Sequence, residues 1–109
     1  MYQGESFEIE FKEVDDTPRD FNDATEIVIA VRVNNVEKKV YKLSDDPNLI
    51  DIDDADSAIV RVINGGLPAS LTKTFPTGMM TVEMKATFPE ETFVTQFVEP
   101  VTKSITTAY

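Results

Sequence analysis

Apolar and polar residues alternate along several segments of the chain with the two-residue period of a β-strand. In residues 6–12 the apolar side chains Phe7, Ile9 and Phe11 fall on one face of an extended chain, and polar or charged side chains fall on the other. Residues 79–88 alternate in the same way. A helix would spread these side chains around its circumference, so both segments predict half-buried strands.

A strongly β-branched segment, residues 27–33, predicts a central strand covered on both sides. Asn34 and Asn35 follow it, and asparagine tolerates the positive φ that a tight hairpin requires. The return strand, residues 36–43, carries three lysines. These lysines predict an edge strand that is protected from pairing with other chains.

Short strands separated by turns continue along the rest of the chain. Asn64-Gly65-Gly66 predicts a sharp turn. Further strands are expected at residues 49–52, 58–63, 71–75, 92–98 and 101–106. About seven to nine short strands predict one all-β domain over residues 1–109, a sandwich or a barrel. Its core is expected to contain Phe7, Ile9, Phe11, Ile29, Val31, Val82, Met84 and Phe88.

Composition restricts the function. The chain has no cysteine and no histidine, which excludes disulfides, thiolate metal sites and the commonest general base. Its net charge of -10 repels phosphate backbones and anionic lipids, so we expect no nucleic-acid partner and no membrane partner. The first residues do not resemble a signal peptide, and no apolar run reaches the roughly 18 residues of a membrane helix.

The acidic run at residues 51–56 is the candidate metal site, because hard cations bind several carboxylate oxygens. Its candidate ligands are Asp51, Asp53, Asp54 and Asp56. The EF-hand pattern fails, since its twelfth position would be Val62 instead of glutamate. We interpret the run as a solvated turn whose carboxylates accept backbone N–H groups. The alternative is a looser calcium site between strands that uses Asp45, Asp46 or these aspartates, as in an adhesin-like domain.

Catalytic chemistry is not predicted. Glu90 and Glu91 are adjacent acids, but neighbours on a strand point to opposite faces, and pairs of acids arise by chance in so acidic a chain. Gly65-Gly66 is not followed by the Gly-Lys-Ser/Thr of a phosphate-binding loop. We therefore expect no enzyme activity, no catalytic residues and no cofactor.

The order of these features resembles the immunoglobulin-like domain of tailed-phage baseplate upper proteins and related virion modules. Gly-Glu-Ser-Phe at residues 4–7 is similar to that family's Gly-Asp-x-aromatic strand start, and residues 18–25 are similar to its Pro-x-Asp-Leu-Thr-Gly-Ala-Thr. Residues 76–80 resemble its Pro-x-Gly-x-Tyr loop. Phe21, Asp23 and Met80 depart from the family's leucine, glycine and tyrosine. The resemblance implies an immunoglobulin-like antiparallel β-sandwich and a structural role in a virion.

The expected function is a non-catalytic structural or assembly protein of a baseplate, tail or capsid surface, made in the bacterial host cytoplasm. It would dock through sheet faces and edge strands onto other virion components or copies of itself. The candidate contacts are Val101, Ile105 and Tyr109 in residues 100–109, which could equally form the last strand. The alternative is a host-encoded, surface-associated module that binds protein or carbohydrate. Against carbohydrate binding, the chain has no tryptophan and three tyrosines.

Overall fold

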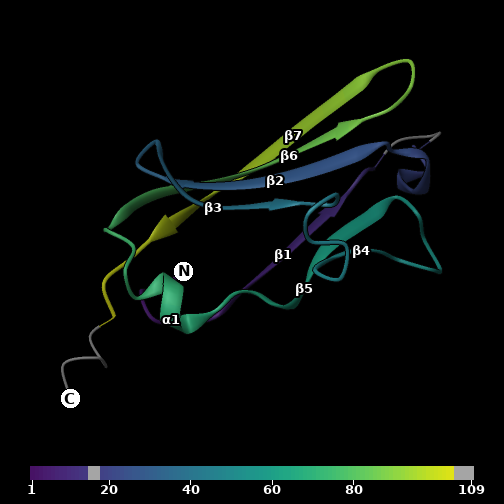
Figure 1. The fold of residues 1–109 in the computed structure, drawn as a ribbon. Coiled ribbons are helices and arrows are strands. Elements are labelled where there is room, and N and C mark those ends of the chain that lie inside the picture. Colours follow the sequence, from purple (N-terminus) through teal and green to yellow (C-terminus); the bar gives the residue numbers. More distant parts are fainter. Residues whose placement is uncertain (15–17, 105–109) are drawn as a thin grey trace.

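The computed structural model describes residues 1–14 and 18–104, which contain seven strands in two antiparallel sheets (Figure 1). The strands are β1 (Phe7–Lys12), β2 (Glu26–Val33), β3 (Val36–Lys42), β4 (Ile50–Ile52), β5 (Ile59–Leu67), β6 (Gly78–Thr87) and β7 (Thr92–Val101). A 3-10 turn, η1 (Phe21–Asp23), follows β1, and a single helical turn, α1 (Ala69–Thr72), follows β5. The prediction of an all-β chain is confirmed.

The two sheets pack as a sandwich with an immunoglobulin-type strand order. One sheet has the order β1-β5-β4 and the other the order β3-β2-β6-β7. In immunoglobulin notation these orders correspond to B-E-D and C′-C-F-G. No full-length strand A accompanies β1 in the described chain, because the segment before it contributes only a parallel bridge from Tyr2 to Thr102. The edges of β1 and β7 are therefore open on the same side of the sandwich.

The core lies between the sheets, where the alternating apolar side chains meet. Of the predicted core residues, Phe7 and Phe88 are half-buried and pack against its margin, whereas the others are buried. The core also takes residues from the connections, including Phe21 of η1 and Phe75 after α1. These two rings close the ends of the sandwich that the strands leave open.

The predicted hairpin and edge strand are both confirmed. Asn34 and Asn35 adopt φ values of 50° and 66°, the left-handed pair of a type I′ turn. The turn joins β2, which lies between β3 and β6, to β3 at the sheet edge. The outer face of β2 is buried at Ala30 and half-buried at Val28, so the strand is covered mainly from the core side.

The sharp turn predicted at residues 64–66 is wrong, because β5 continues through this segment to Leu67. Gly66 has a φ of +60°, and Phe7 of β1 faces both Gly66 and Leu67. The glycine therefore provides a bulge in the ladder instead of a chain reversal. A glycine with a positive φ can serve either a turn or a bulge, and the local sequence does not distinguish the two. The pairing of β5 with β1 decides for the bulge.

Two further strand predictions are wrong. The strand expected at residues 71–75 is instead the helical turn α1 and the residues after it. The buried Thr72 there donates its hydroxyl to the carbonyl of Glu5 at 2.6 Å, which fixes this segment to the start of the chain. The last strand expected from residue 101 does not begin there, since β7 runs without interruption through Pro100 to Val101. Residues 105 and 106 lie outside the described residues.

Candidate functional site

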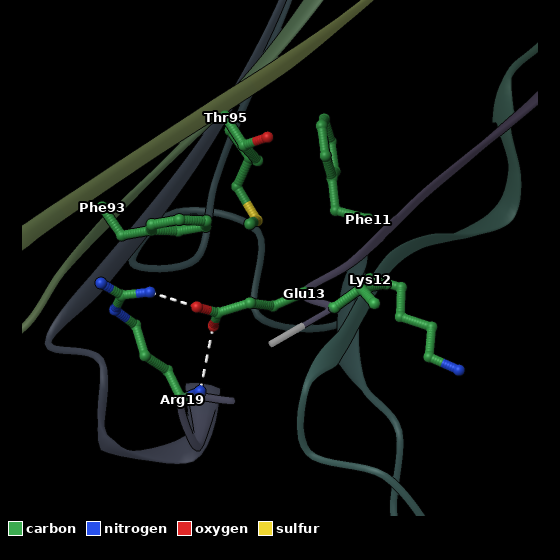
Figure 2. Close-up of a pocket in the computed structure, with 8 residues that line it drawn as sticks. Phe11, Lys12, Glu13, Arg19, Phe93 and Thr95 are labelled. Carbon is green, nitrogen blue, oxygen red and sulfur yellow. Dashed lines mark hydrogen bonds and ion pairs between the residues drawn. The ribbon is translucent and has the colours of Figure 1, made fainter. Parts of the chain in front are cut away.

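A hollow of about 350 Å³ opens between the end of β1 and the start of β7 (Figure 2). It lies on the side of the sandwich where strand A would run in a complete immunoglobulin sheet. Its lining residues are Phe11, Lys12, Glu13, Val14, Arg19, Met84, Phe93 and Thr95. Met84 belongs to the buried core, so the hollow reaches the interior of the sandwich.

Arg19 organises the polar side of the hollow. Its guanidinium carbon lies 4.4 Å from the centre of the Phe93 ring, a cation–π contact that Figure 2 shows from the side. Its Nε donates to Glu91 Oε1 at 2.7 Å, and its Nη1 pairs with the Glu13 carboxylate. The Arg19 backbone N–H also donates to Glu13 Oε2 at 3.0 Å. One arginine thus ties the segment after β1 to the β6–β7 turn.

The electrostatics of this cluster oppose acid–base chemistry. The hydrogen bond from Arg19 lowers the pKa of Glu91, and the same bond is the main cause that raises the pKa of Arg19. Both groups therefore stay charged at neutral pH. Glu13 is held by two bonds from Arg19, and Thr95 supplies the hydroxyl of the lining. In the part of the chain that the structure describes, no basic side chain is hydrogen-bonded to the Thr95 hydroxyl, which is the contact that activates such a nucleophile.

Aromatic rings close most of the gap between β1 and β7. The Phe97 ring centre lies 5.3 Å from that of Phe11 and 6.2 Å from that of Phe7. At the other end of β7, Phe93 lies 6.0 Å from Phe21 of η1. Tilted rings at these distances pack favourably. The hollow is consequently lined by both kinds of side chain: Phe11, Met84 and Phe93 supply apolar surface, and Lys12, Glu13, Arg19 and Thr95 supply polar groups.

Two of the four predicted metal ligands, Asp51 and Asp53, lie beside Arg61 of β5. Asp53 Oδ2 is 3.0 Å from Arg61 Nη1, and Asp51 Oδ2 is 3.8 Å from the same nitrogen. Asp53 Oδ1 accepts the N–H groups of Ala55 and Asp56 at 2.8 and 3.0 Å. The hydrogen bond from Ala55 is the main cause of a lowered Asp53 pKa, followed by that from Arg61. A cation here would have to displace the guanidinium.

The remaining acids do not complete a site. Asp56 Oδ1 accepts the N–H of Ala58 at 3.1 Å, and Asp54 is exposed. Among the described residues, no group of three or more acidic side chains is arranged to hold a metal ion. Glu90 and Glu91 do not act as a pair of acids: Glu91 forms an ion pair with Arg19, and Glu90 is exposed to solvent. The solvated-turn interpretation fits the observed hydrogen bonds.

The predicted partner contacts receive no support as a free surface. Val101 is buried at 3% exposure, so its side chain belongs to the core, and the prediction of a partner contact there is wrong. Ile105 and Tyr109 lie outside the described residues. The sequence analysis missed Arg19, Glu13 and Phe93, which define the hollow. The sequence offered one signal for this cluster: Arg19 is a single cation in an acidic stretch, and Glu90 and Glu91 form an acidic turn far along the chain that could pair with it.

Fold and site together define a class: an immunoglobulin-type antiparallel β-sandwich whose recess is built from structural ion pairs and rings. Comparison with protein-family models, with curated proteins and with solved structures found no match. Over the residues described, no helix is long and apolar enough to cross a membrane.

Proposed function

We propose that this chain is a non-catalytic assembly module of a virion, at a baseplate, tail or capsid surface, which docks through a sheet edge and the adjoining sheet face. The observation that carries the proposal is the open edge of β7. From Thr92 to Val98 this edge strand has no charged residue. Soluble proteins usually protect such an edge, so an unprotected one favours pairing with another chain.

Exposed apolar side chains beside this edge support a docking role. Val94 and Val98 of β7 are 53% and 49% exposed, and Met79 of β6 is 50% exposed. Met79 lies opposite Pro100 in the β6–β7 register, next to the pair of Thr81 and Val98. Val98, Met79 and Pro100 thus form a small apolar patch on the outer face of the four-stranded sheet, whereas Val94 lies opposite Lys85. Exposed apolar side chains at an open edge favour a contact surface.

The chemistry of the recess favours a binding role over a catalytic one. Arg19 is paired with Glu13 and Glu91, and the apolar side chains of Phe11, Met84 and Phe93 lie beside these ion pairs. The tyrosines argue against a carbohydrate platform. Tyr41 is buried, while Tyr2 is exposed beside Thr102, past the other end of β7 from the recess residues. A flat sugar-binding surface usually needs several exposed aromatic rings, so protein is the favoured partner.

Recovery of the chain from assembled particles tests the proposal. A tagged chain would be expressed in producing bacteria, and particles would be purified on a density gradient and analysed by mass spectrometry. We expect the chain in the particle fraction, and a loss of it when Val94 and Val98 are both changed to lysine. The matched control is Val36→Lys on the β3 edge, which is equally exposed. A chain found on the host cell surface and never in particles would contradict the proposal.

A further inference from the structure

We propose that two copies of this chain pair antiparallel along their β7 edges, so that two four-stranded sheets join into one sheet of eight strands. The inference rests on the proposed function and deepens it, because it names the partner at the open edge as a second copy. The contact is isologous: the same strand of each copy meets across a two-fold axis.

The hydrogen bonds at the end of β7 show which of its backbone groups face the open side. Thr102 N donates to Met1 O, and Gln3 N donates to Thr102 O, both at 2.9 Å. The Met1 ammonium donates to Pro100 O, also at 2.9 Å. Thr102 and Pro100 therefore point their backbone groups away from β6. Pro100 fits there because its missing N–H costs the β6–β7 ladder nothing.

Backbone groups of a strand alternate in direction, and the β6–β7 register has no irregularity. Among the described residues, the N–H and C=O groups without a backbone partner along the rest of this edge consequently belong to Thr92, Val94, Gln96 and Val98. The N-terminal segment covers the edge at Pro100 and beyond, so it leaves residues 92–98 for a partner. This is the length of an ordinary strand.

The other sheet edges of the described chain carry protection that β7 lacks. β3 carries Lys38, Lys39 and Lys42, and its register with β2 is irregular beside Arg32. β1 exposes Glu8, Glu10 and Lys12, and β4 has three residues. Charges and irregular pairing of this kind oppose edge-to-edge association. With a net charge of -10, two copies would repel unless their contact surface were nearly uncharged, and β7 provides such a surface.

The open stretch also sets the register. Its midpoint is Thr95, and placing Thr95 opposite Thr95 of the second copy pairs every open backbone group. On the outer face Val94 then lies opposite Gln96, and Thr92 opposite Val98. On the inner face Phe93, whose ring lines the recess, lies opposite Phe97. Within residues 92–98 no charged side chain faces another, and aromatic cross-strand pairs of this kind stabilise sheets. Just beyond them Glu99 lies opposite Glu91 of the second copy, and each of these carboxylates is already paired within its own copy, with the Met1 ammonium and with Arg19.

Cross-linking and sedimentation test the dimer. Because the chain has no cysteine, Thr95→Cys introduces a single thiol at the two-fold axis, and mild oxidation is expected to give a disulfide-linked dimer on a denaturing gel. Val36→Cys, a more exposed position on the β3 edge, is the control and should nevertheless cross-link far less. Sedimentation velocity of the unmodified chain up to about 1 mM should show a reversible monomer–dimer equilibrium.

Two variants weaken the contact without disturbing the subunit. Gln96→Pro removes an N–H that faces the open side, so the β6–β7 ladder is kept while dimerisation falls by about tenfold or more. Val98→Lys protects the edge with a charge and leaves the backbone unchanged. Circular dichroism would verify the fold of each. Should Gln96→Pro not fold, Val98→Lys decides alone.

A chain that stays monomeric at every concentration overturns the inference, and so does a dimer that Val98→Lys leaves intact and Thr95→Cys does not cross-link. These results are distinct from failure of the virion role. Particles that incorporate a strictly monomeric chain would remove the dimer and keep the assembly function. A chain that dimerises but is never found in particles would keep the dimer and remove the assembly function.

Discussion

The hydroxyl of Tyr41 donates a buried hydrogen bond to the carbonyl of Gly66 at 2.8 Å. Tyr41 lies on β3 and Gly66 on β5, so the bond joins the two sheets through the core. Gly66 holds a φ of +60°, and a Cβ there would lie 2.5 Å from the carbonyl oxygen of Phe7. The bulge in β5 and the tyrosine on the opposite sheet thus depend on each other.

Tyr41→Phe should destabilise the fold by about 1–2 kcal/mol, because the Gly66 carbonyl would be left buried without its donor. Burial raises the pKa of Tyr41 above its ordinary value of 10.0. The stabilisation from this side chain is therefore complete below pH 10 and is lost as the pH rises through the raised pKa. Urea unfolding at neutral and alkaline pH measures both effects. A variant as stable as the parent would contradict this role.

Gly66→Ala should cost about 2–4 kcal/mol, since it combines a disfavoured backbone conformation with a clash against the rigid backbone of β1. Thermal unfolding followed by circular dichroism provides the measurement. Had the glycine been an ordinary exposed turn residue, the loss would stay near 1 kcal/mol. The size of the loss therefore separates the bulge from the turn that the sequence predicted.

Asn35→Gly should stabilise the β2–β3 hairpin by roughly 0.5 kcal/mol, because Asn-Gly is the preferred pair of a type I′ turn. Asn34→Gly is the matched change and should destabilise by about 1 kcal/mol, since it removes side-chain bonds. Asn34 Oδ1 accepts the N–H of Met79, and its Nδ2 donates to Thr77, each at 3.1 Å. Equal effects of the two changes on the melting temperature would show that these bonds contribute nothing.

Glu91→Gln should lower the melting temperature at pH 7, where the ion pair with Arg19 is fully formed. Arg19 depresses the pKa of Glu91 below the ordinary 4.5, so this stabilisation exists above pH 4.5 and disappears as the pH falls through the depressed pKa. The two proteins should therefore converge in acid. Glu90→Gln, its exposed neighbour, is the control. A difference that persists unchanged at low pH would rule out the ion pair as its cause.

Addition of calcium, or of a chelator, should leave the melting temperature unchanged. Asp53 is already bonded to Arg61 and to two backbone N–H groups, and the described residues hold no group of three or more acidic side chains placed to bind a cation. A bound ion would raise the melting temperature with its concentration. A concentration-dependent rise that Asp53→Asn abolishes would restore the calcium alternative.

Local alternation predicted the strands well, because apolar side chains at every second position have one favourable placement, against the other sheet. Ile9, Phe11, Val82 and Met84 are buried as expected. The predictions failed where two local structures shared one sequence signal. The glycines near residue 66 allow either a turn or a bulge, and the apolar residues after Pro68 allow either a short strand or a helical turn.

The site was less predictable than the fold. Arg19 and Glu91 lie 72 positions apart, and their pairing depends on how η1 and the β6–β7 turn meet at one end of the sandwich. Acidic neighbours in sequence, such as Asp53 and Asp54, formed a candidate metal site, but the described residues do not bring three or more acidic side chains together to hold an ion. Long-range ion pairs leave no periodic trace in the chain, so the recess could not be anticipated.

By itself the sequence determined which faces of the strands are apolar, where the Asn34-Asn35 hairpin reverses, and that β3 is an edge protected by lysines. These features follow from side-chain chemistry at neighbouring positions. Only the tertiary structure decided that β7 is an edge without such protection and that its backbone groups at Gln96 face outward. Edge position depends on which strands pair across the whole fold, and that is set by the packing of distant segments instead of by local residue preference.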